Sequence, residues 1–113
     1  MKIESVDDIS LVQAASRFAA LGSEQRLGVL RTLVRAGPEG LPIGELGKRT
    51  GVTGSTLTHH MKILADAGLV RQVRDGRRIL CHGAFDEMTA LSDFLLRECC
   101  ADSGDNQEGH VHD

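Results

Sequence analysis

The sequence predicts a mainly α-helical domain that contains one small β-hairpin. Two patterns point to this fold class: apolar residues recur at helical spacing through most of the chain, and one stretch of β-suited residues surrounds an Asp-Gly pair. The chain has 113 residues, which is enough to bury one hydrophobic core without disulfide bonds. No internal repeat is visible. We therefore expect a single folded domain over residues 1–100.

The first two helices are predicted from apolar spacing and from the residues at their boundaries. Between Ile9 and Leu21, apolar side chains cover much of the helix circumference, so this helix needs partners on several sides. Gly22 ends it, and Ser23 is suited to cap a second helix, which Gly37-Pro38 closes. The predicted apolar stripe of the second helix consists of Leu27, Leu30, Leu33 and Val34.

A short helix, a tight turn at Gly51 and a second helix opened by Thr53 are predicted between residues 41 and 67. Helical spacing divides the second of these helices into two faces. One face consists of Leu57, Met61 and Leu64, with His60 beside them. The other consists of Gly54, Ser55, Thr58, His59 and Lys62. We expect the first face to pack and the second to be free for recognition.

Residues 69–82 predict the β-hairpin. Two runs of β-suited residues flank Asp75-Gly76, and an Asp-Gly pair in that setting is the strongest short-range hairpin signal. The arginines around this turn are Arg71, Arg74, Arg77 and Arg78. Helix, turn, helix and basic hairpin, in that order, make a winged helix-turn-helix, whose second helix enters the DNA major groove. The order of elements therefore predicts binding to double-stranded DNA.

Helical spacing returns in the last predicted helix, which runs from about Phe85 to Cys99. Its stripe consists of Phe85, Met88, Leu91, Leu95 and Cys99. The acidic, Gly-rich segment 101–113 should be a disordered tail. His110 and His112 with Asp113 could bind a divalent metal, but a solvated tail is the expected state.

Charge is distributed unevenly along the chain. The net charge is −3, yet residues 48–78 contain seven basic and two acidic residues, so this third of the chain carries +5 and the remainder −8. Such a distribution is expected when one surface meets phosphate. A winged helix that binds protein instead of DNA remains a rival interpretation, which the positive segment disfavours.

Several classes of protein are excluded or disfavoured. No apolar run approaches the roughly 20 residues that span a membrane, and the first ten residues lack the pattern of a signal peptide. We therefore expect a cytoplasmic protein without membrane contact, whose three cysteines are reduced thiols. A thiol enzyme is disfavoured because there is no Cys-x-x-Cys, no phosphate-cradling loop before a cysteine and no βαβ order.

The sequence resembles the ArsR/SmtB family of small, dimeric winged-helix repressors. The resemblance covers roughly residues 18–96, and it is carried by "ALGSEQRLGVLRTL" and by "GVTGSTLTHHMKILADAGLVRQVRDGRRILC". It implies a dimer formed by the first and last helices and release from DNA when a metal or metalloid binds. It also implies DNA contacts from Thr53, Ser55, Thr58, His59, Lys62, Arg74, Arg77 and Arg78. Gly54 departs from the family, which commonly has Gln or another long side chain there.

Two inducer sites known in the family are not expected here. A metalloid site in the third helix uses Cys-x-Cys, where this chain has Pro42 and Gly44. A zinc-type site in the last helix needs His, which "DEMTALSDFLLRE" lacks. The remaining candidate ligands are Cys81, Cys99 and Cys100.

A helix from Asp86 to Cys99 would be about 20 Å long, so Cys81 and Cys99 of one chain would lie at its opposite ends. The resemblance implies that the last helices pair antiparallel across the dimer axis. That pairing would bring Cys81 of one protomer close to Cys99 of the other, and to Cys100 if the last turn frays.

Thiolates without His or carboxylate partners suit trivalent arsenic or antimony better than Zn²⁺. We therefore expect a repressor that needs no cofactor and is released by arsenite, methylarsenite or antimonite, with a two-thiolate site favouring methylarsenite. A redox or persulfide switch through a Cys81–Cys99 bridge and release by another soft metal remain alternatives. Each cysteine could also be a buried or bystander residue.

Overall fold

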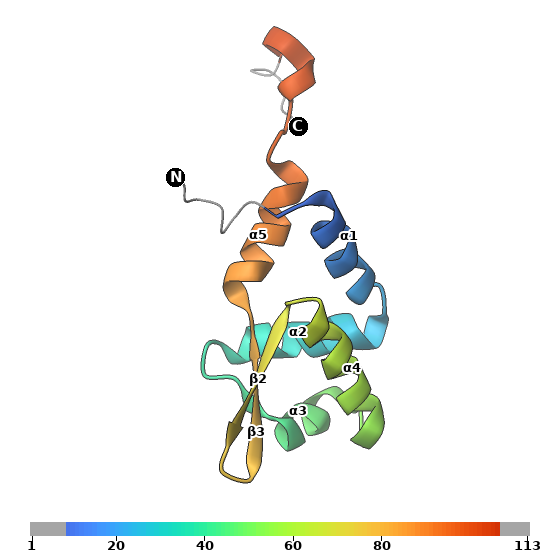
Figure 1. The fold of residues 1–113 in the computed structure, drawn as a ribbon, viewed down its shortest axis with the longest axis vertical. Coiled ribbons are helices and arrows are strands. Elements are labelled where there is room, and N and C mark those ends of the chain that lie inside the picture. Colours follow the sequence, from blue (N-terminus) through green and yellow to red (C-terminus); the bar gives the residue numbers. More distant parts are fainter. Residues whose placement is uncertain (1–8, 107–113) are drawn as a thin grey trace.

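The computed structural model describes residues 9–106 (Figure 1). Its elements are α1 (Leu11–Ala20), α2 (Glu24–Ala36), β1 (Leu41–Pro42), α3 (Ile43–Thr50), α4 (Gly54–Asp66), β2 (Val70–Asp75), β3 (Arg78–Gly83), α5 (Phe85–Leu96) and the 3-10 helix η2 (Ala101–Asn106). The predicted order of helices around one hairpin is confirmed, and α3, α4 and the hairpin form a winged helix-turn-helix. Figure 1 shows α1 and α5 at one end of the molecule and the tip of the hairpin at the other.

Side-chain caps set the first residues of α1 and α2. Ser10 and Gln13 form a capping box, in which the Ser10 hydroxyl accepts from the Gln13 N–H at 3.0 Å and the Gln13 side chain accepts from the Ser10 N–H at 2.9 Å. Helix α1 therefore begins at Leu11, two residues later than predicted. Ser23 caps α2 as predicted, accepting from the Arg26 N–H at 3.3 Å. Thr53 is the residue before α4, but its side chain makes no capping hydrogen bond.

The core lies where α2, α3 and α4 meet the sheet. Helix α4 buries Leu57, Met61 and Leu64, as its predicted face requires. The predicted stripe of α2 is partly wrong, because Leu27 and Val34 are 42% and 45% exposed. The buried residues of α2 are Val29, Leu30 and Leu33. The face of α2 that meets α3, α4 and β3 is therefore rotated from the predicted one.

The sheet has one strand that the sequence did not predict. Strand β1 pairs antiparallel with β3, which lies between β1 and β2. A strand of two residues that includes a proline gives no periodic signal. Its approach to β3 is close, since a Cβ atom on Gly40 would lie only 2.3 Å from the Cys81 carbonyl oxygen.

The hairpin turn lies one residue later than predicted. Asp75 pairs with Arg78, so the two-residue loop is Gly76-Arg77 and not Asp75-Gly76. Gly76 has φ 66°, which suits the first loop position of a primed turn. The loop brings Arg77 to the tip of the hairpin.

The carboxyl-terminal region differs from the prediction in two respects. Helix α5 ends at Leu96, so Cys99 lies in a turn beyond it and is not part of the helical stripe. Residues 101–106 of the tail, predicted to be disordered, form η2. Its start is held by the Ser103 hydroxyl, which donates to the Cys100 carbonyl at 2.8 Å. His110, His112 and Asp113 lie outside the described residues.

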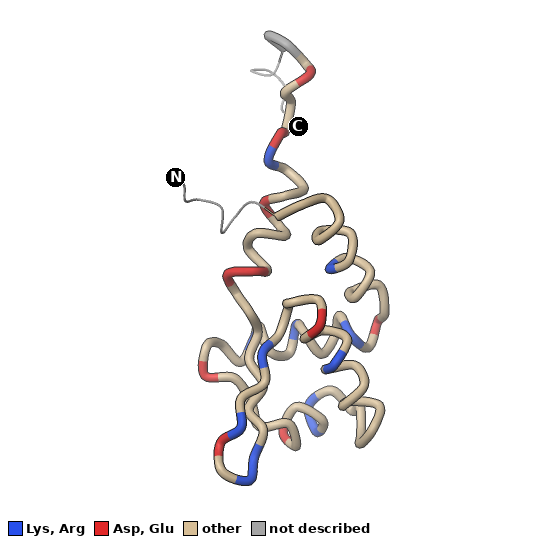
Figure 2. Tube along the Cα trace, viewed as in Figure 1, with Lys and Arg blue, Asp and Glu red and all other residues tan. Residues whose placement is uncertain are grey.

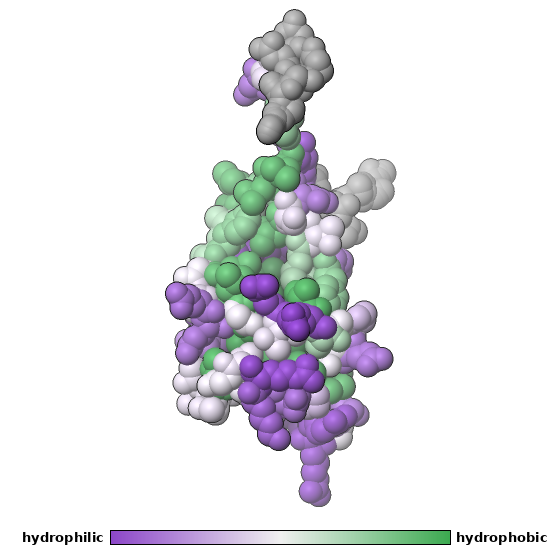
Figure 3. Space-filling view, turned by 180° about the vertical axis from the view of Figure 1, so that it is seen from behind, coloured by the Kyte–Doolittle hydropathy of each residue, from purple (hydrophilic) through white to green (hydrophobic). Residues whose placement is uncertain are grey.

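A hydrophobic surface covers the end of the molecule that contains α1 and α5. Its large side chains are exposed: Leu11 (73%), Val12 (78%), Leu95 (66%) and Leu96 (71%). Figure 3 shows green surface gathered over this end, away from the hydrophilic hairpin end. An apolar patch of this kind marks an interaction site. None of the helices within residues 9–106 has the length and apolar character needed to cross a membrane.

The rotated face of α2 can be tested with two leucines. Leu33→Ala should lower the free energy of unfolding by about 2–5 kcal/mol, because Leu33 is fully buried. The matched change Leu27→Ala should cost less than about 1 kcal/mol, because Leu27 is 42% exposed. Urea denaturation measures both. Equal losses would contradict the packing described for α2.

Candidate nucleic-acid interface and thiol site

The candidate reading face is the outer side of α4. The predicted contact residues of this helix and its cap are all exposed: Thr53, Ser55, Thr58, His59 and Lys62. They are exposed because Leu57, Met61 and Leu64 anchor the opposite side in the core. Hydroxyl, imidazole and ammonium groups can bind base edges or phosphates. The structure thus brings these side chains to one surface, while their contact with DNA stays a prediction.

Two of these side chains have local partners. The Thr58 hydroxyl donates to the Gly54 carbonyl at 3.3 Å, and Lys62 lies 3.3 Å from the Asp66 carboxylate. The Lys62–Asp66 pair is exposed on both sides, so it is weak and can exchange for a phosphate contact. These contacts leave the reading face available.

His60 belongs to the core and not to the reading face. It is 8% exposed, and its Nε2 atom lies 2.8 Å from Gln25 Oε1 on α2. Burial lowers the pKa of His60, and the nearby Arg26 and His59 lower it further. Its Nδ1 atom has no hydrogen-bond partner among the described residues. His60 therefore packs α4 against α2.

The arginines of the hairpin fall into two groups. Arg78 pairs with Asp75 at 3.0 Å, and Arg71 pairs with Asp86 at 3.2 Å. Arg74 and Arg77 are exposed and form no ion pair within residues 9–106. Figure 2 shows basic residues gathered at the hairpin tip. Of the predicted wing contacts, Arg74 and Arg77 are therefore the two whose charge is not already paired.

A groove separates α3 from α4 on the side that carries Thr53 and Thr58. It has a volume of about 420 Å³. Gly44 and Gly54 line it, and a Cβ atom on either would meet nothing within 4 Å. The groove is therefore open at Gly44 and Gly54, two of the three positions where the chain departs from the pattern of the family it resembles.

Cys81 is fully buried in β3, paired with Leu41 on one side and Gln72 on the other. Burial raises the pKa of the Cys81 thiol from its ordinary value of 9.0 to about 11. A thiol with so high a pKa is a poor metal ligand and a poor nucleophile at neutral pH. In this conformation Cys81 is a core residue.

Cys99 and Cys100 are exposed and adjacent. Their sulfur atoms lie 3.1 Å apart in a hydrogen bond. That hydrogen bond from Cys99 is the main cause that raises the pKa of Cys100. Cys100 has φ 70°, in the left-handed region that few non-glycine residues adopt. The backbone thus turns the two side chains toward one another, which a regular helix would not do.

The three thiols do not meet within one chain. Cys81 precedes α5 and Cys99 follows it, and the 12 residues of α5 span about 18 Å. Across residues 9–106, no group of three or more His, Cys, Asp or Glu side chains could hold a metal ion. One chain therefore offers a pair of thiols, and the cross-dimer contact of Cys81 with Cys99 stays a prediction.

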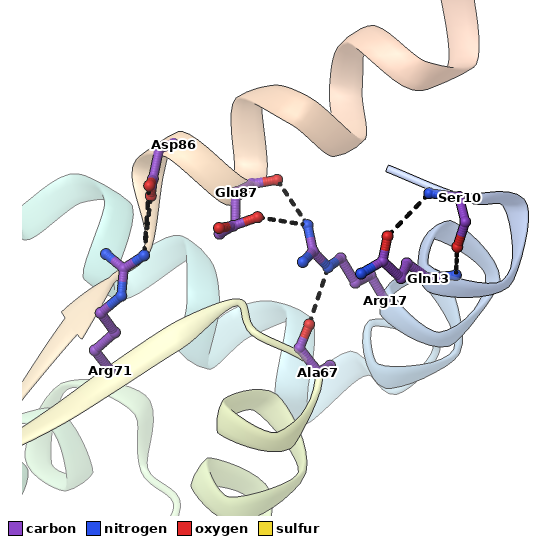
Figure 4. Close-up of polar contacts among 7 residues, drawn as sticks. All are labelled: Ser10, Gln13, Arg17, Ala67, Arg71, Asp86 and Glu87. Carbon is purple, nitrogen blue, oxygen red and sulfur yellow. Dashed lines mark hydrogen bonds and ion pairs between the residues drawn. The ribbon is translucent and has the colours of Figure 1, made fainter. Parts of the chain in front are cut away.

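Sequence reasoning missed Arg17. This α1 residue is 9% exposed, and its guanidinium binds the end of α4 and the start of α5 (Figure 4). The signal that could have found it is a lone charged residue within a helix that is otherwise apolar on most sides. Its partners are 50 and 70 residues away, so local pattern could not identify them.

The buried thiol predicts a pH dependence of stability. The folded-state pKa of about 11 lies above the ordinary 9.0, so the folded chain keeps a proton that the unfolded chain loses. This contribution is intact below pH 9 and is lost as the pH rises toward 11, up to about 2–3 kcal/mol. Cys81→Ala should flatten the fall in unfolding free energy over this range, whereas Cys99→Ala should not. Parallel curves for Cys81→Ala and the unchanged chain would contradict the assignment.

Comparison with known proteins now identifies the family. Residues 21–73 match the model of a helix-turn-helix domain. The chain is 40% identical over 63 residues to the uncharacterized HTH-type transcriptional regulator YceK of Bacillus subtilis, an alignment that covers 56% of this chain and 62% of that protein. It is 37% identical over 71 residues to the HTH-type transcriptional regulator YgaV of Escherichia coli, over 63% of this chain and 70% of that protein.

Solved structures agree with the sequence comparison. An ArsR-like transcriptional regulator from Rhodococcus sp. RHA1 superposes with a TM-score of 0.67 at 25% identity, over 89% of this chain and 96% of that one. A homodimeric winged helix-turn-helix DNA-binding domain from Mycobacterium bovis shares the fold with a TM-score of 0.63 at 23% identity, over 98% of this chain and 97% of that one. As predicted, these relatives carry the names of transcriptional regulators. The chain belongs to the ArsR family of helix-turn-helix transcriptional regulators.

Proposed function

We propose that this chain forms a homodimeric repressor that binds a double-stranded DNA operator. The observation that carries the proposal is the exposed polar face of α4 together with two exposed hairpin arginines, Arg74 and Arg77, that form no ion pair within residues 9–106. Helix α4 enters the major groove, and the hairpin follows the adjacent backbone. The acidic remainder of the chain repels phosphate and so orients the protein on the duplex.

The hydrophobic surface over α1 and α5 supports a second copy of the chain as partner. Leu11, Val12, Leu95 and Leu96 expose large apolar side chains at this end of the molecule, and a surface of this kind is expected to meet a partner. Figure 3 shows hydrophobic surface gathered there. A two-fold axis through this patch repeats α4 on the far side of the dimer. Two recognition helices then meet successive major grooves, which lie about 34 Å apart along one face of B-DNA.

The contact residues divide by chemistry. Ser55, Thr58 and His59 can reach base edges, and Lys62 can reach a phosphate by leaving Asp66. Thr53 lies at the helix start, where the amide N–H groups also favour phosphate. Arg74 and Arg77 bind the backbone electrostatically, and Arg78 contributes less because, like Lys62, it must first leave a carboxylate partner, here Asp75.

Salt dependence tests the role of the hairpin. Arg77→Ala should weaken binding to all DNA sequences and reduce the slope of log affinity against log salt by about one for each bound chain. Arg78→Ala should change the slope less, because Asp75 already pairs with that side chain. Arg31→Ala, on α2, is the charge-matched control and should leave the slope unchanged. Equal slopes for Arg77→Ala and Arg31→Ala would contradict a wing contact.

We further propose that a trivalent arsenical or antimonite releases the repressor by binding cysteine thiolates. The 3.1 Å approach of the Cys99 and Cys100 sulfurs supports two soft ligands on one guest. A hollow of about 340 Å³ beside Cys99, with Phe94 and Leu95 in its wall, offers room for an apolar substituent. These features favour methylarsenite over arsenite.

A third ligand from Cys81 of the partner subunit requires an opening of the core. Cys81 is fully buried, and its pKa of about 11 favours the protonated thiol. The adjacent pair is therefore the first capture site, and Cys81 can join only in a rearranged dimer. That rearrangement would misplace the two recognition helices. Inducer binding would therefore weaken DNA binding, and DNA binding would weaken inducer binding by the same factor. A coupling of about 2.7 kcal/mol would suffice for a hundredfold loss of DNA affinity.

An inducer titration separates these alternatives. Protein bound to the DNA upstream of its own gene is titrated with arsenite, methylarsenite, antimonite, Zn²⁺, Cd²⁺, an organic persulfide and peroxide, and release is followed by fluorescence anisotropy. We expect methylarsenite to release the unchanged protein, and Cys99→Ser and Cys100→Ser each to lose the response. Cys81→Ala is preferred to Cys81→Ser because a buried hydroxyl without a partner would itself destabilise the core.

Each other outcome changes the assignment. Release by persulfide or peroxide alone would move the chain to thiol redox sensing, including a Cys81–Cys99 bridge. Release by Cd²⁺ alone would identify a soft-metal sensor. A full response of Cys81→Ala to methylarsenite would show that Cys81 of the partner subunit is not a ligand. If no compound releases the protein from DNA, the thiol-inducer proposal is wrong. If the protein does not bind the DNA at low salt, the repressor proposal is wrong.

A further inference from the structure

Arg17 ties three helices together. Its Nε donates to the Ala67 carbonyl at 3.0 Å, and its Nη1 lies 2.9 Å from Glu87 Oε1 and 3.5 Å from the Glu87 carbonyl oxygen. The side chain is only 10% exposed, and the Glu87 side chain is 27% exposed. Figure 4 shows the guanidinium reaching from α1 between the end of α4 and the first turn of α5. One buried cation thus contacts the recognition helix and the last helix together.

The charges at these helix ends explain why Arg17 lies there. Helix α4 has no basic residue in its last turn, so its negative carboxyl end lacks a partner on its own chain segment. The guanidinium of Arg17 supplies that positive charge from α1. Glu87 lies in the first turn of α5, where a negative charge is favourable, and completes the pairing. A planar guanidinium can serve both acceptors at once, whereas an ammonium is a single point of charge.

The backbone beyond α4 is shaped around this side chain. Gly68 has φ 82°, and a Cβ atom there would lie 3.2 Å from Arg17 Nη2. The chain therefore passes close under the guanidinium as it leaves α4. The carboxyl end of α4 is held at this point by a contact with α1, one of the two helices that carry the exposed hydrophobic surface.

We propose that Arg17 is a positioning residue that sets the angle of α4 relative to α1 and α5, and thereby the half-site spacing that the dimer accepts. This inference rests on the proposed function, because it assumes that two copies of α4 read one operator. In the proposed dimer, the carboxyl end of each α4 lies against α1 and α5, the helices that carry the hydrophobic surface. The amino end of α4 enters the major groove. Arg17 binds α4 at its carboxyl end, the point about which this helix would tilt, which we call the pivot.

A small change at the pivot has a large effect at the DNA. Helix α4 has 13 residues and is about 20 Å long, so a tilt of about 10° at Ala67 moves its first residue by about 3 Å. That displacement is close to the roughly 3.4 Å rise of one base pair. Loss of the Arg17 contacts should therefore let the dimer accept half-site spacings that differ by about one base pair. Every side chain of the reading face would stay in place.

Spacing preference is the readout that a merely structural role would not move. The operator is located as the palindrome that the protein protects from nuclease cleavage in the DNA upstream of its gene. It is then prepared with its natural half-site spacing, with one base pair added between the half-sites, with one base pair removed, and as a single half-site. Dissociation constants are measured for the unchanged protein and for Arg17→Met, Arg17→Lys and Glu87→Gln. Asp86→Asn is the matched control, because it breaks the exposed Arg71–Asp86 pair on the same turn of α5.

We expect the unchanged protein to prefer the natural spacing by about tenfold or more and Arg17→Met by less than about threefold. Half-site affinity should stay within about twofold, since the reading face is intact. Arg17→Lys and Glu87→Gln should be intermediate, and Asp86→Asn should match the unchanged protein. Because Arg17→Lys keeps the buried charge, its result stands even if Arg17→Met fails to fold.

Three results would overturn the inference. Unchanged spacing preference in Arg17→Lys, Glu87→Gln and any folded Arg17→Met would remove the positioning role. An equal loss of half-site and full-site affinity would show local damage to α4 instead. An unchanged protein that binds all three spacings equally would show that α4 is not held at a set angle. Failure of the unchanged protein to bind DNA at all is a different result, which overturns the proposed function itself.

Discussion

The structure depends on the burial of one face of α4. Leu57, Met61 and Leu64 enter the core between α2 and the sheet, and a helix that buries one side must present the other. The exposure of Ser55, Thr58 and His59 is thus a consequence of hydrophobic packing and needs no separate cause. His60 extends the packed face, since its ring reaches Gln25 on α2. The candidate reading face and the core that holds the fold are two sides of one helix.

Much of this arrangement follows from local pattern, and the exceptions have physical reasons. The faces of α4 and the place of the hairpin in the chain are predictable from apolar spacing and turn chemistry, although the turn itself lies one residue later than predicted. Strand β1 is too short to show a period, and it exists because Gly40 lets the backbone approach β3. The buried face of α2 was misjudged at Leu27 because several apolar positions compete and only tertiary contacts choose among them.

The candidate sites were predictable to different degrees. Exposure of the residues proposed to contact DNA follows from helical period. Which arginines lack an ion pair within residues 9–106 depends on carboxylates such as Asp75 and Asp86. Alternation along β3 could not decide whether Cys81 is buried, because the wing has one packed side and one open side. Arg17 could not be assigned from sequence at all, because its partners come from distant elements that meet only in the fold.

The burial of Cys81 also has a kinetic meaning. Its sulfur can meet solvent only when the packing around β3 opens, so any reagent that consumes it reports the frequency of that opening. Cys99 and Cys100 are exposed and can react without any opening, whereas Cys81 reacts only after local unfolding. A signal that needs all three thiols would therefore carry a built-in delay. A repressor of this kind would stay on its operator when the inducer is present briefly and leave it when the inducer persists.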